Sequence, residues 1–548
     1  MPGCTPIGVC SDSCAEGGEG GESPVAAGGK ISSAGGAPVT GGASMAGAPA
    51  AGGRLAVGGA PWGGEGGDSG AGGRVPVVEE GLEVRTASPL LLVRRGESVQ
   101  ASIELTRLGD FDGPVQVRFS QLPGGVISGT ELLTGEVGKV DISLLAAGDA
   151  ALGGPHKVRL EAMSLDGDLS AEAELELIVA DEVGTLDRDF GDDGVLLGEG
   201  STVAGLSMDD ERHIYLAVNV QADENYGLVR RANADGAWEE APSFEPPNEG
   251  HIGTAISAFA FDAESMWLGV QAYNVGEATK DGVLRLGLDG HPIATFGEAG
   301  FVETSSAPTS IVLRPEGAFV LGTDATLLAL TNEGASDESF NLYSGDCLSQ
   351  IAADNKGNLF VSCIDEPGMA LRVLKVLGDG SLDESFGERG ELAIAVGGTF
   401  GLRFNSILDQ SDGAFLLTYT ESTSGKLISV NEAGALVGSF GSQGMATLDP
   451  TYINPGVPFS TNFVTAGILT SAETFGGMGV LHLFDEGGSL QTSFGSGGEL
   501  TINSLIAELN VEPDFSGYWR VAADPLGAWV VLAGGVVEDE VGIVRMWL

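Results

Sequence analysis

Cys347 and Cys363 form the residue pair whose spacing most directly suggests chemistry. They flank the turn "DNKG" at 354–357, which separates two apolar runs typical of a β-hairpin. Their numbers sum to 710 and the ends of the turn sum to 711, so the two residues lie almost opposite each other across an antiparallel pair. Facing residues there approach to about 4.5–5.5 Å between Cα atoms. We therefore predict a Cys347–Cys363 disulfide and an oxidising compartment; the alternative is two buried free thiols.

The segment "DRDFGDDG" at 187–194 carries four carboxylates, those of Asp187, Asp189, Asp192 and Asp193. Clustered carboxylate oxygens suit calcium. Related segments elsewhere in the chain place Ser, Gly or Thr at these positions, which argues against a repeated metal site. We therefore consider one calcium site here, with solvated turn carboxylates as the alternative, and expect no other cofactor.

The five histidines show no spacing that indicates a metal or catalytic site. They are scattered at His156, His213, His251, His291 and His482. The chain contains no H-E-x-x-H or C-x-x-C zinc motif, no phosphate-binding G-x-x-x-x-G-K-[ST] and no G-x-S-x-G nucleophile turn. His213 and His251 are the two that can share the rim of a channel. We predict no catalytic residue.

An eleven-residue phrase recurs along the C-terminal two thirds of the chain. Five clear copies occupy 184–194, 290–300, 380–390, 434–444 and 488–498, the third reading "GSLDESFGERG". With two decayed copies, "GAWEEAPSFEPPNEG" and "GASDESFNLYSG", its phenylalanine falls at Phe190, Phe244, Phe296, Phe340, Phe386, Phe440 and Phe494. The mean separation of about 51 residues is typical of propellers and solenoids.

Each repeat contains four apolar runs that predict four strands, which is the composition of a β-propeller blade. The count predicts seven blades over residues 181–548. The last unit ends in "VGIVRMWL". Either "IVRMW" pairs with "GVLLG" at 194–198 and clasps the ring, or the ring closes by face packing alone; the sequence leaves both open.

The phrase itself predicts a structural role rather than a catalytic one. Its glycines permit positive φ at tight turns, and Asp and Ser hydrogen-bond their own backbone there. Its phenylalanine would wedge between adjacent blades, each burial stabilising by roughly 1.5–3 kcal/mol. The pattern G-S-L-D-x-S-F-G-x-x-G resembles the delta-60 repeat. That resemblance implies a bacterial, exported protein and a repeat fold rather than a particular activity.

The first 180 residues differ from the repeats in composition. Residues 1–75 are rich in Gly and Ala and predict a disordered tether, in which Cys4, Cys10 or Cys14 is a candidate for a lipid anchor. Residues 76–180 contain about seven alternating runs separated by turn residues, which predict a β-sandwich. The stretch "GPVQVRFSQLPGGV" at 113–126 resembles bacterial immunoglobulin-like surface domains.

Charge and hydropathy narrow the class of partner. With 77 Asp and Glu against 26 Lys and Arg, the net charge of −51 argues against binding to nucleic acid or anionic lipid. No segment is long and apolar enough to span a membrane as a helix. We expect a non-catalytic, extracellular or cell-envelope protein that binds a glycan, a cell-wall polymer or a surface protein, with 450–460 and 505–516 as recognition loops. The alternative is a lyase or hydrolase with its site in the central channel.

Overall fold

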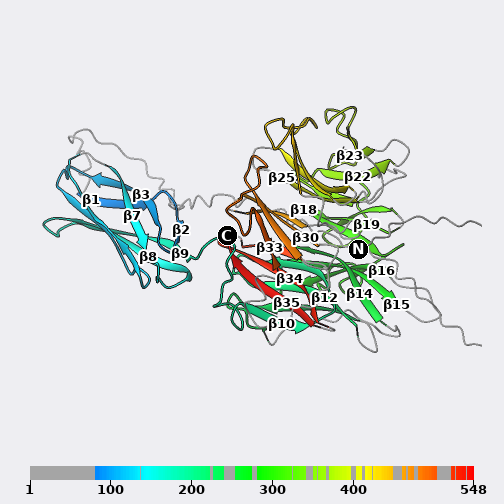
Figure 1. Ribbon diagram of the computed structural model, residues 1–548, viewed down its shortest axis with the longest axis horizontal. Helices are drawn as coiled ribbons and strands as arrows, with labels where there is room; N and C mark the ends of the chain where they lie inside the picture. The colour runs from blue at the N-terminus through cyan, green and yellow to red at the C-terminus, as the bar shows by residue number, and fades with distance from the viewer. Residues whose placement is uncertain are drawn as a thin grey trace, which may run out of the picture. The chain divides into compact units, whose positions relative to one another are not determined.

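The computed structural model describes residues 80–135, 138–221, 226–239, 253–273, 281–323, 325–340, 350–354, 356–365, 370–396, 403–409, 414–421, 424–448, 460–464, 467–473, 479–502, 520–524, 526–537 and 540–548 (Figure 1). Every named element of this part is a strand, from β1 to β35, so the protein is all-β. Within the same residues, no helix has the length and apolar character needed to cross a membrane.

The N-terminal nine strands form a sandwich of two sheets. One sheet has the order β1-β3-β7-β5 and the other the order β2-β9-β8-β4-β6. Their bounds are β1 Gly81–Thr86, β2 Leu90–Arg94, β3 Ser98–Leu108, β4 Val115–Ser120, β5 Val126–Ser128, β6 Thr130–Leu133, β7 Lys139–Ala146, β8 Gly153–Ser164 and β9 Ser170–Ala180. Alternate residues, such as Ile103, Val117 and Leu160, point into one shared core because successive side chains in a strand face opposite sides. The two sheets therefore agree with the predicted sandwich.

The remaining strands form seven further sheets in the described part of 181–548. Five of them have four strands. The other two have three strands within the described residues. The first four sheets are β11 Thr202–Met208, β12 Ile214–Val220 and β13 Tyr226–Ala232; β14 Gly253–Phe261, β15 Ser265–Tyr273, β16 Asp281–Gly287 and β17 Phe301–Thr304; β18 Pro308–Arg314, β19 Gly317–Gly322 and β20 Leu327–Thr331; and β21 Gln350–Ala353, β22 Leu359–Asp365, β23 Ala370–Val376 and β24 Glu391–Ala395. The last three are β25 Arg403–Asp409, β26 Phe415–Glu421, β27 Ser424–Val430 and β28 Met445–Thr447; β29 Ser460–Val464, β30 Gly467–Glu473, β31 Gly479–Phe484 and β32 Glu499–Thr501; and β33 Arg520–Ala523, β34 Trp529–Val537, β35 Glu540–Trp547 and β10 Val195–Glu199.

The first strands of these seven sheets make a closed ring. Each contacts the first strand of the next sheet, in the order β11, β14, β18, β21, β25, β29 and β33, and β33 contacts β11 again. Within each sheet the strands follow one another outward in antiparallel order. Seven sheets around one axis define a seven-bladed β-propeller, so the predicted fold is confirmed.

Strand β10, the first strand of the propeller in the sequence, closes the ring by joining the sheet formed by the last strands of the chain. It pairs antiparallel with the C-terminal strand β35, with Val195 opposite Val544 and Glu199 opposite Glu540 (Figure 1). The blade boundary is therefore offset from the repeated phrase, and the clasp is the correct alternative of the two that the sequence left open. We call the sheet of β33, β34, β35 and β10 the closing blade.

The two ends of the blades differ in their connections. Because the strands of a blade run alternately up and down, the connections from strand one to two and from three to four share one end. The repeated phrase joins strands three and four, and we call this the repeat end. Connections from strand two to three, and from one blade to the next, leave from the opposite end, which we call the variable end.

Candidate functional site

The phenylalanines of the repeated phrase lie inside the propeller. Six of the seven fall within the described residues, and each of these is at most 5% exposed: Phe190, Phe296, Phe340, Phe386, Phe440 and Phe494. Phe244 lies outside the described residues. A side chain that is buried in every described copy contributes apolar packing and is not accessible to a ligand.

In four copies of the phrase, the glycine after the phenylalanine bonds to the next blade. Gly387 donates its N–H to the Ala433 carbonyl at 2.8 Å, and Gly191 does the same to Asp235 at 2.8 Å. The receiving turn must carry glycine, because Gly434 has a φ of +78° and a Cβ there would lie 2.5 Å from the Gly387 nitrogen. We call this contact the interlock. The phrase therefore couples neighbouring blades.

A cation and a carboxylate accompany the interlock in several blades. Lys375 Nζ lies 3.2 Å from an Asp383 carboxylate oxygen and 6.0 Å from the centre of the Phe386 ring. In the closing blade, Arg545 Nη2 lies 2.6 Å from Asp187 Oδ2, and its guanidinium lies 4.8 Å from the Phe190 ring. The carboxylate is thus an ion-pair partner of the third strand in both blades.

This pairing accounts for part of the predicted calcium cluster. Asp187 is only 1% exposed and bonds to Arg545, whereas Asp193 is exposed and lies 3.1 Å from Arg188. Within the described ranges, which include all of 187–194, no three or more Asp, Glu, His or Cys side chains converge as metal ligands. The segment is a turn whose carboxylates face different surroundings, and it does not form the calcium site that the sequence suggested.

A second buried ion pair crosses the seam between the first blade and the closing blade. Arg212 Nε lies 3.0 Å from Asp524 Oδ1, and Asp524 is fully buried. The Trp529 ring lies beneath two guanidinium groups, 4.1 Å from that of Arg212 and 4.6 Å from that of Arg545. Burial raises the pKa of Asp524 and lowers that of Arg212, with each partner opposing the shift of the other. These groups are positioned to hold the seam together.

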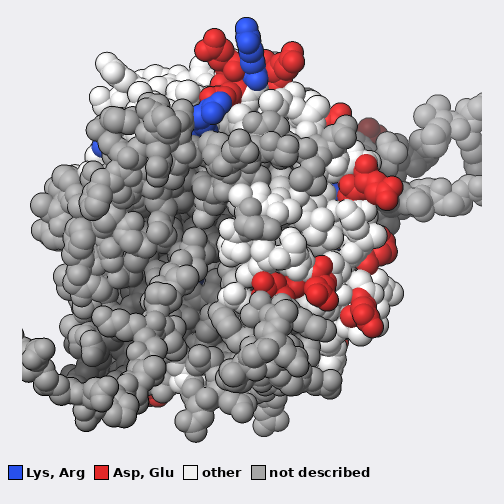
Figure 2. Space-filling view, turned by 90° about the vertical axis from the view of Figure 1, so that its right-hand side faces the viewer, with Lys and Arg blue, Asp and Glu red and all other residues white. Residues whose placement is uncertain are grey.

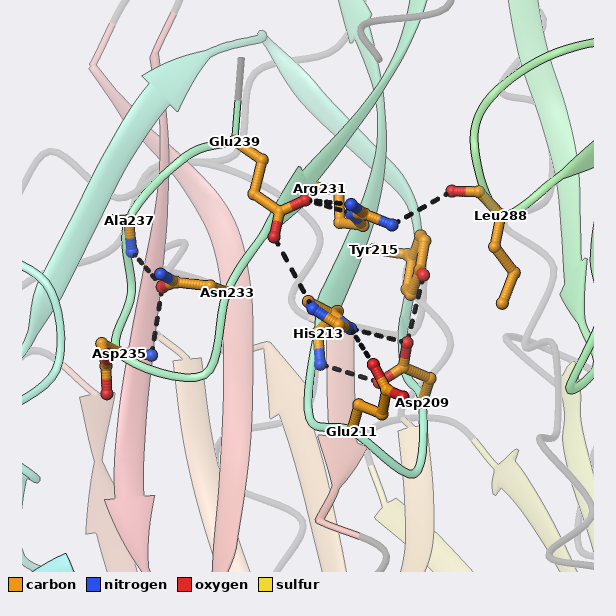
Figure 3. A network of polar contacts seen from close by, with 10 residues as sticks. All are labelled: Asp209, Glu211, His213, Tyr215, Arg231, Asn233, Asp235, Ala237, Glu239 and Leu288. Atoms are coloured by element: carbon orange, nitrogen blue, oxygen red, sulfur yellow. Dashed lines mark hydrogen bonds and ion pairs between the residues drawn. The ribbon is translucent and has the colours of Figure 1, made fainter. Parts of the chain in front are cut away.

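A histidine surrounded by carboxylates lies on the first blade (Figure 3). His213 follows the turn from β11 to β12, and its Nδ1 lies 2.9 Å from Asp209 Oδ2 and 3.8 Å from Glu211 Oε2. Its Nε2 lies 3.6 Å from Glu239 Oε1, which comes from the segment after β13. Glu239 also pairs with Arg231. We call these five residues the His213 cluster.

The His213 cluster is a network of hydrogen bonds and close contacts between fixed partners. The Tyr215 hydroxyl donates to Asp209 Oδ2 at 3.1 Å, and burial raises the pKa of Tyr215 to about 12, so this hydroxyl stays protonated at neutral pH. Both imidazole nitrogens face carboxylates of the same blade. The imidazole therefore connects the β11–β12 turn to the segment that follows β13.

Sequence reasoning identified His213 but not its neighbours. It grouped His213 with His251, which lies outside the described residues. The missed signal was the repeat itself: Glu239 donates its N–H to the Arg231 carbonyl just as Asp383 does to Lys375. Of the other histidines, His156 lies in β8, His291 is exposed in a copy of the phrase, and His482 of β31 lies 3.6 Å from Glu499.

The predicted disulfide falls only partly within the described residues. Cys347 lies outside them, while Cys363 is in β22 opposite Arg372 of β23. Strand β21 pairs Gln350 with Ser362, so facing residues in this hairpin sum to 712 rather than 710. The register therefore differs by one from the turn-based sum of 711 and by two from the sum of 710 for the two cysteines, and the disulfide stays a prediction.

Comparison with known proteins assigns no family to the chain. No family model and no curated protein matches it. Among solved structures, a protein from Lactobacillus plantarum is 12% identical over 62% of this chain and 91% of its own, with a TM-score of 0.35. Prolyl oligopeptidase B from Galerina marginata is 11% identical over 61% of this chain and 47% of its own, with a TM-score of 0.37. A conjugative transposon lipoprotein from Bacteroides eggerthii is 23% identical over 18% of this chain and 95% of its own, with a TM-score of 0.15. Similarity at this level transfers no activity.

Proposed function

We propose that this chain is a non-catalytic binding protein, exported or held in the cell envelope, whose propeller presents its variable end to a ligand. The observation that carries the proposal is the difference between the two ends of the blades. At the repeat end, the phrase recurs with the same buried phenylalanine and, in several copies, with the same interlock. Residues committed to holding blades together are not free to specify a ligand.

The connections at the variable end differ in length from blade to blade. From β17 to β18 the connection is only 305–307, whereas from β32 to β33 it spans 502–519. The predicted recognition loops 450–460 and 505–516 belong to this end by their flanking strands and lie outside the described residues, apart from Ser460 at the start of β29. Long connections on a rigid scaffold are where binding residues concentrate.

Composition favours a neutral or weakly charged partner with apolar faces. The long connections carry five aromatic residues: Tyr452, Phe459, Phe515, Tyr518 and Trp519. Aromatic side chains are enriched in binding surfaces, and they offer flat apolar faces to sugar rings and to protein side chains. On the face drawn in Figure 2, acidic side chains dominate over basic ones among the described residues. A glycan, a cell-wall polymer or a surface protein fits this composition better than nucleic acid does.

The proposed location of the protein, outside the cell or in the cell envelope, rests on the tether and on the resemblance to delta-60 repeats. A Gly- and Ala-rich segment over 1–75 suits a flexible stalk, and a lipid on Cys4, Cys10 or Cys14 would attach it to a membrane surface. The sandwich would then act as a spacer, and its kinship with immunoglobulin-like surface domains is part of this proposal.

A binding screen with the full chain tests the function. The protein is applied to a glycan array, to purified cell-wall polymer and to intact cells, beside a variant whose residues 505–516 are replaced by a Gly/Ser segment of equal length. We expect saturable binding that the loop variant loses. The matched control, Glu384→Gln with Glu388→Gln, changes two exposed residues of the repeat end and should bind normally.

Two outcomes contradict the proposal. Binding that the control variant loses and the loop variant keeps would place the contact surface at the repeat end. Release of sugar or peptide fragments from the probes would favour the lyase or hydrolase alternative.

A further inference from the structure

Strand β10 differs from the fourth strand of a regular blade in how it reaches its sheet. In a regular blade, β24 follows β23 after the phrase at 380–390 and pairs with it. In the closing blade, β10 instead pairs with β35 from the other end of the chain. The place of β10 in its sheet therefore depends on contacts between segments that are far apart in the sequence.

Three residues meet where β10 lies against the first blade. Trp238 Nε1 donates to the Leu197 carbonyl at 2.7 Å, and the Arg230 guanidinium lies 3.9 Å from the centre of the Trp238 ring. Both side chains fill the space beside Gly198, because a Cβ there would lie 2.5 Å from Arg230 Nη1 and 2.8 Å from Trp238 Cζ2. A larger residue at position 198 would therefore displace one or both of them.

All three residues depart from the pattern of the repeat. Trp238 bridges to Ala232 of the third strand, and the residues at the same place in the other blades are Leu186, Pro292, Ser336, Leu382, Leu436 and Leu490. Arg230 lies two residues before that bridge, where the other blades carry Leu284, Leu328, Leu374, Ile428, His482 and Val544. Gly198 lies four residues after the last glycine of its phrase, where the other clear copies carry Thr304, Ile394, Leu448 and Ile502.

The same space is filled differently between regular blades. Ile394 of β24 and Ile428 of β27 are at most 7% exposed and belong to one apolar core, and Ile502 and Val544 share another. At the first blade, glycine removes the side chain from the fourth strand, and an arginine and a tryptophan take its space. Because protein interiors are closely packed, the three departures fit only in combination.

We propose that Gly198, Arg230 and Trp238 form a lock that fastens β10 to the first blade and so keeps the ring closed. The lock adds a hydrogen bond and a cation–π contact to the pairing of β10 with β35. The Tyr226 hydroxyl of β13 adds a hydrogen bond to Glu199 at the end of β10. Detachment of β10 breaks all of these contacts together. The lock goes beyond the proposed binding function and does not depend on it.

Hydrogen–deuterium exchange of the full chain tests the lock. The exchange rate of the backbone amides of 195–199 reports how often β10 detaches. Trp238→Leu introduces the residue that four of the five clear copies carry, and it removes the indole hydrogen bond and the ring under Arg230. We expect about tenfold faster exchange of β10 in this variant. The matched control, Leu490→Ala, changes the same phrase position in another blade and should leave the exchange of β10 unchanged.

Rebuilding a regular contact gives a second test. Gly198→Ile alone should speed the exchange of β10 more than Trp238→Leu does, because the larger side chain collides with Arg230 and Trp238. Adding Arg230→Ile and Trp238→Leu copies the packing of Ile394 against Ile428 and should restore slow exchange, since contacting residues act non-additively. Unchanged exchange in Trp238→Leu, or a triple variant that exchanges as fast as Gly198→Ile alone, would overturn the proposal.

Discussion

In the blade of β21 to β24, Lys375 and Asp383 lie eight residues apart in the sequence, whereas in the closing blade the equivalent pair, Arg545 and Asp187, is 358 residues apart. The geometry is otherwise the same. Asp383 donates its N–H to the Lys375 carbonyl at 2.9 Å, and Asp187 donates to the Arg545 carbonyl at 2.9 Å. The ring therefore closes with the backbone hydrogen bond that every other blade forms between residues close in sequence.

The difference between the two pairs lies in burial and in chain entropy. The Asp383 side chain is 17% exposed, while that of Asp187 is 2% exposed. Bringing together residues 358 apart rather than eight apart costs about 3 kcal/mol more in loop-closure entropy. The closing blade thus forms the same contact at a larger entropic cost, and its carboxylate is less exposed to water. The pairing of β10 with β35 helps to hold the two residues together.

The largest expected loss of stability comes from removing a phenylalanine of the phrase. Phe190→Ala in the closing blade and Phe386→Ala in the regular blade each leave a cavity in a packed core, so each should lower the free energy of unfolding by about 3–5 kcal/mol. Urea denaturation followed by tryptophan fluorescence measures both. Similar losses would support a common role, and a loss below about 1 kcal/mol in either would separate the two blades.

The next effect separates the two ion pairs. Asp187→Ala leaves the Arg545 guanidinium buried without its carboxylate and should cost about 3–5 kcal/mol, whereas Asp383→Ala should cost about 1 kcal/mol because water reaches that pair. Thermal unfolding of the two variants gives the ranking. Asp193→Asn serves as the exposed control, because asparagine tolerates the positive φ of this position, and it should leave the melting temperature unchanged. A larger loss in Asp383→Ala than in Asp187→Ala would reverse the comparison.

Acid titration should sharpen the same comparison, because the two carboxylates shift in opposite directions. A hydrogen bond from Ser385, with further help from Lys375, lowers the pKa of Asp383, so its stabilisation is present at neutral pH and is lost as pH falls through the lowered value. Burial raises the pKa of Asp187, so its contribution grows as pH falls through the raised value. Relative to Asp383→Asn the natural protein should lose stability between pH 6 and pH 3, and relative to Asp187→Asn it should gain. Parallel curves for the two variants would show that the two environments are alike.

The smallest effect concerns the turn within the phrase. Ala299 has a φ of +54°, which disfavours a side chain, and the last copy carries Gly497 at the same place with a φ of +70°. Ala299→Gly should therefore stabilise the propeller by about 0.5 kcal/mol, since relief of strain exceeds the added freedom of the unfolded chain. A shift in the urea midpoint measures it. Gly387→Ala, the opposite change, should destabilise, because a Cβ there would lie 2.0 Å from the Glu391 carbonyl oxygen.

Prediction from sequence was most successful for features that repeat. The period of the phrase indicated seven units, and the structure describes seven blades, because each unit carries its own turns and apolar runs. The predicted register that placed Cys347 opposite Cys363 was based only on the sequence positions of the turn residues. The turn in fact closes with Asp354 bonded to Asn358, so the ladder begins at Ala353 opposite Leu359 and the register moves.

Sequence alone therefore determined the blades, their number and the burial of the phenylalanines in the phrase, since these depend on hydrogen bonds and apolar spacing within about 50 residues. Only the tertiary structure decided that β10 pairs with β35, that Asp187 belongs to Arg545 rather than to calcium, and that three carboxylates surround His213. Those contacts join segments that come together only when the ring closes or a blade folds. Their partners are set by the geometry of the whole ring, which no local pattern of residue types encodes.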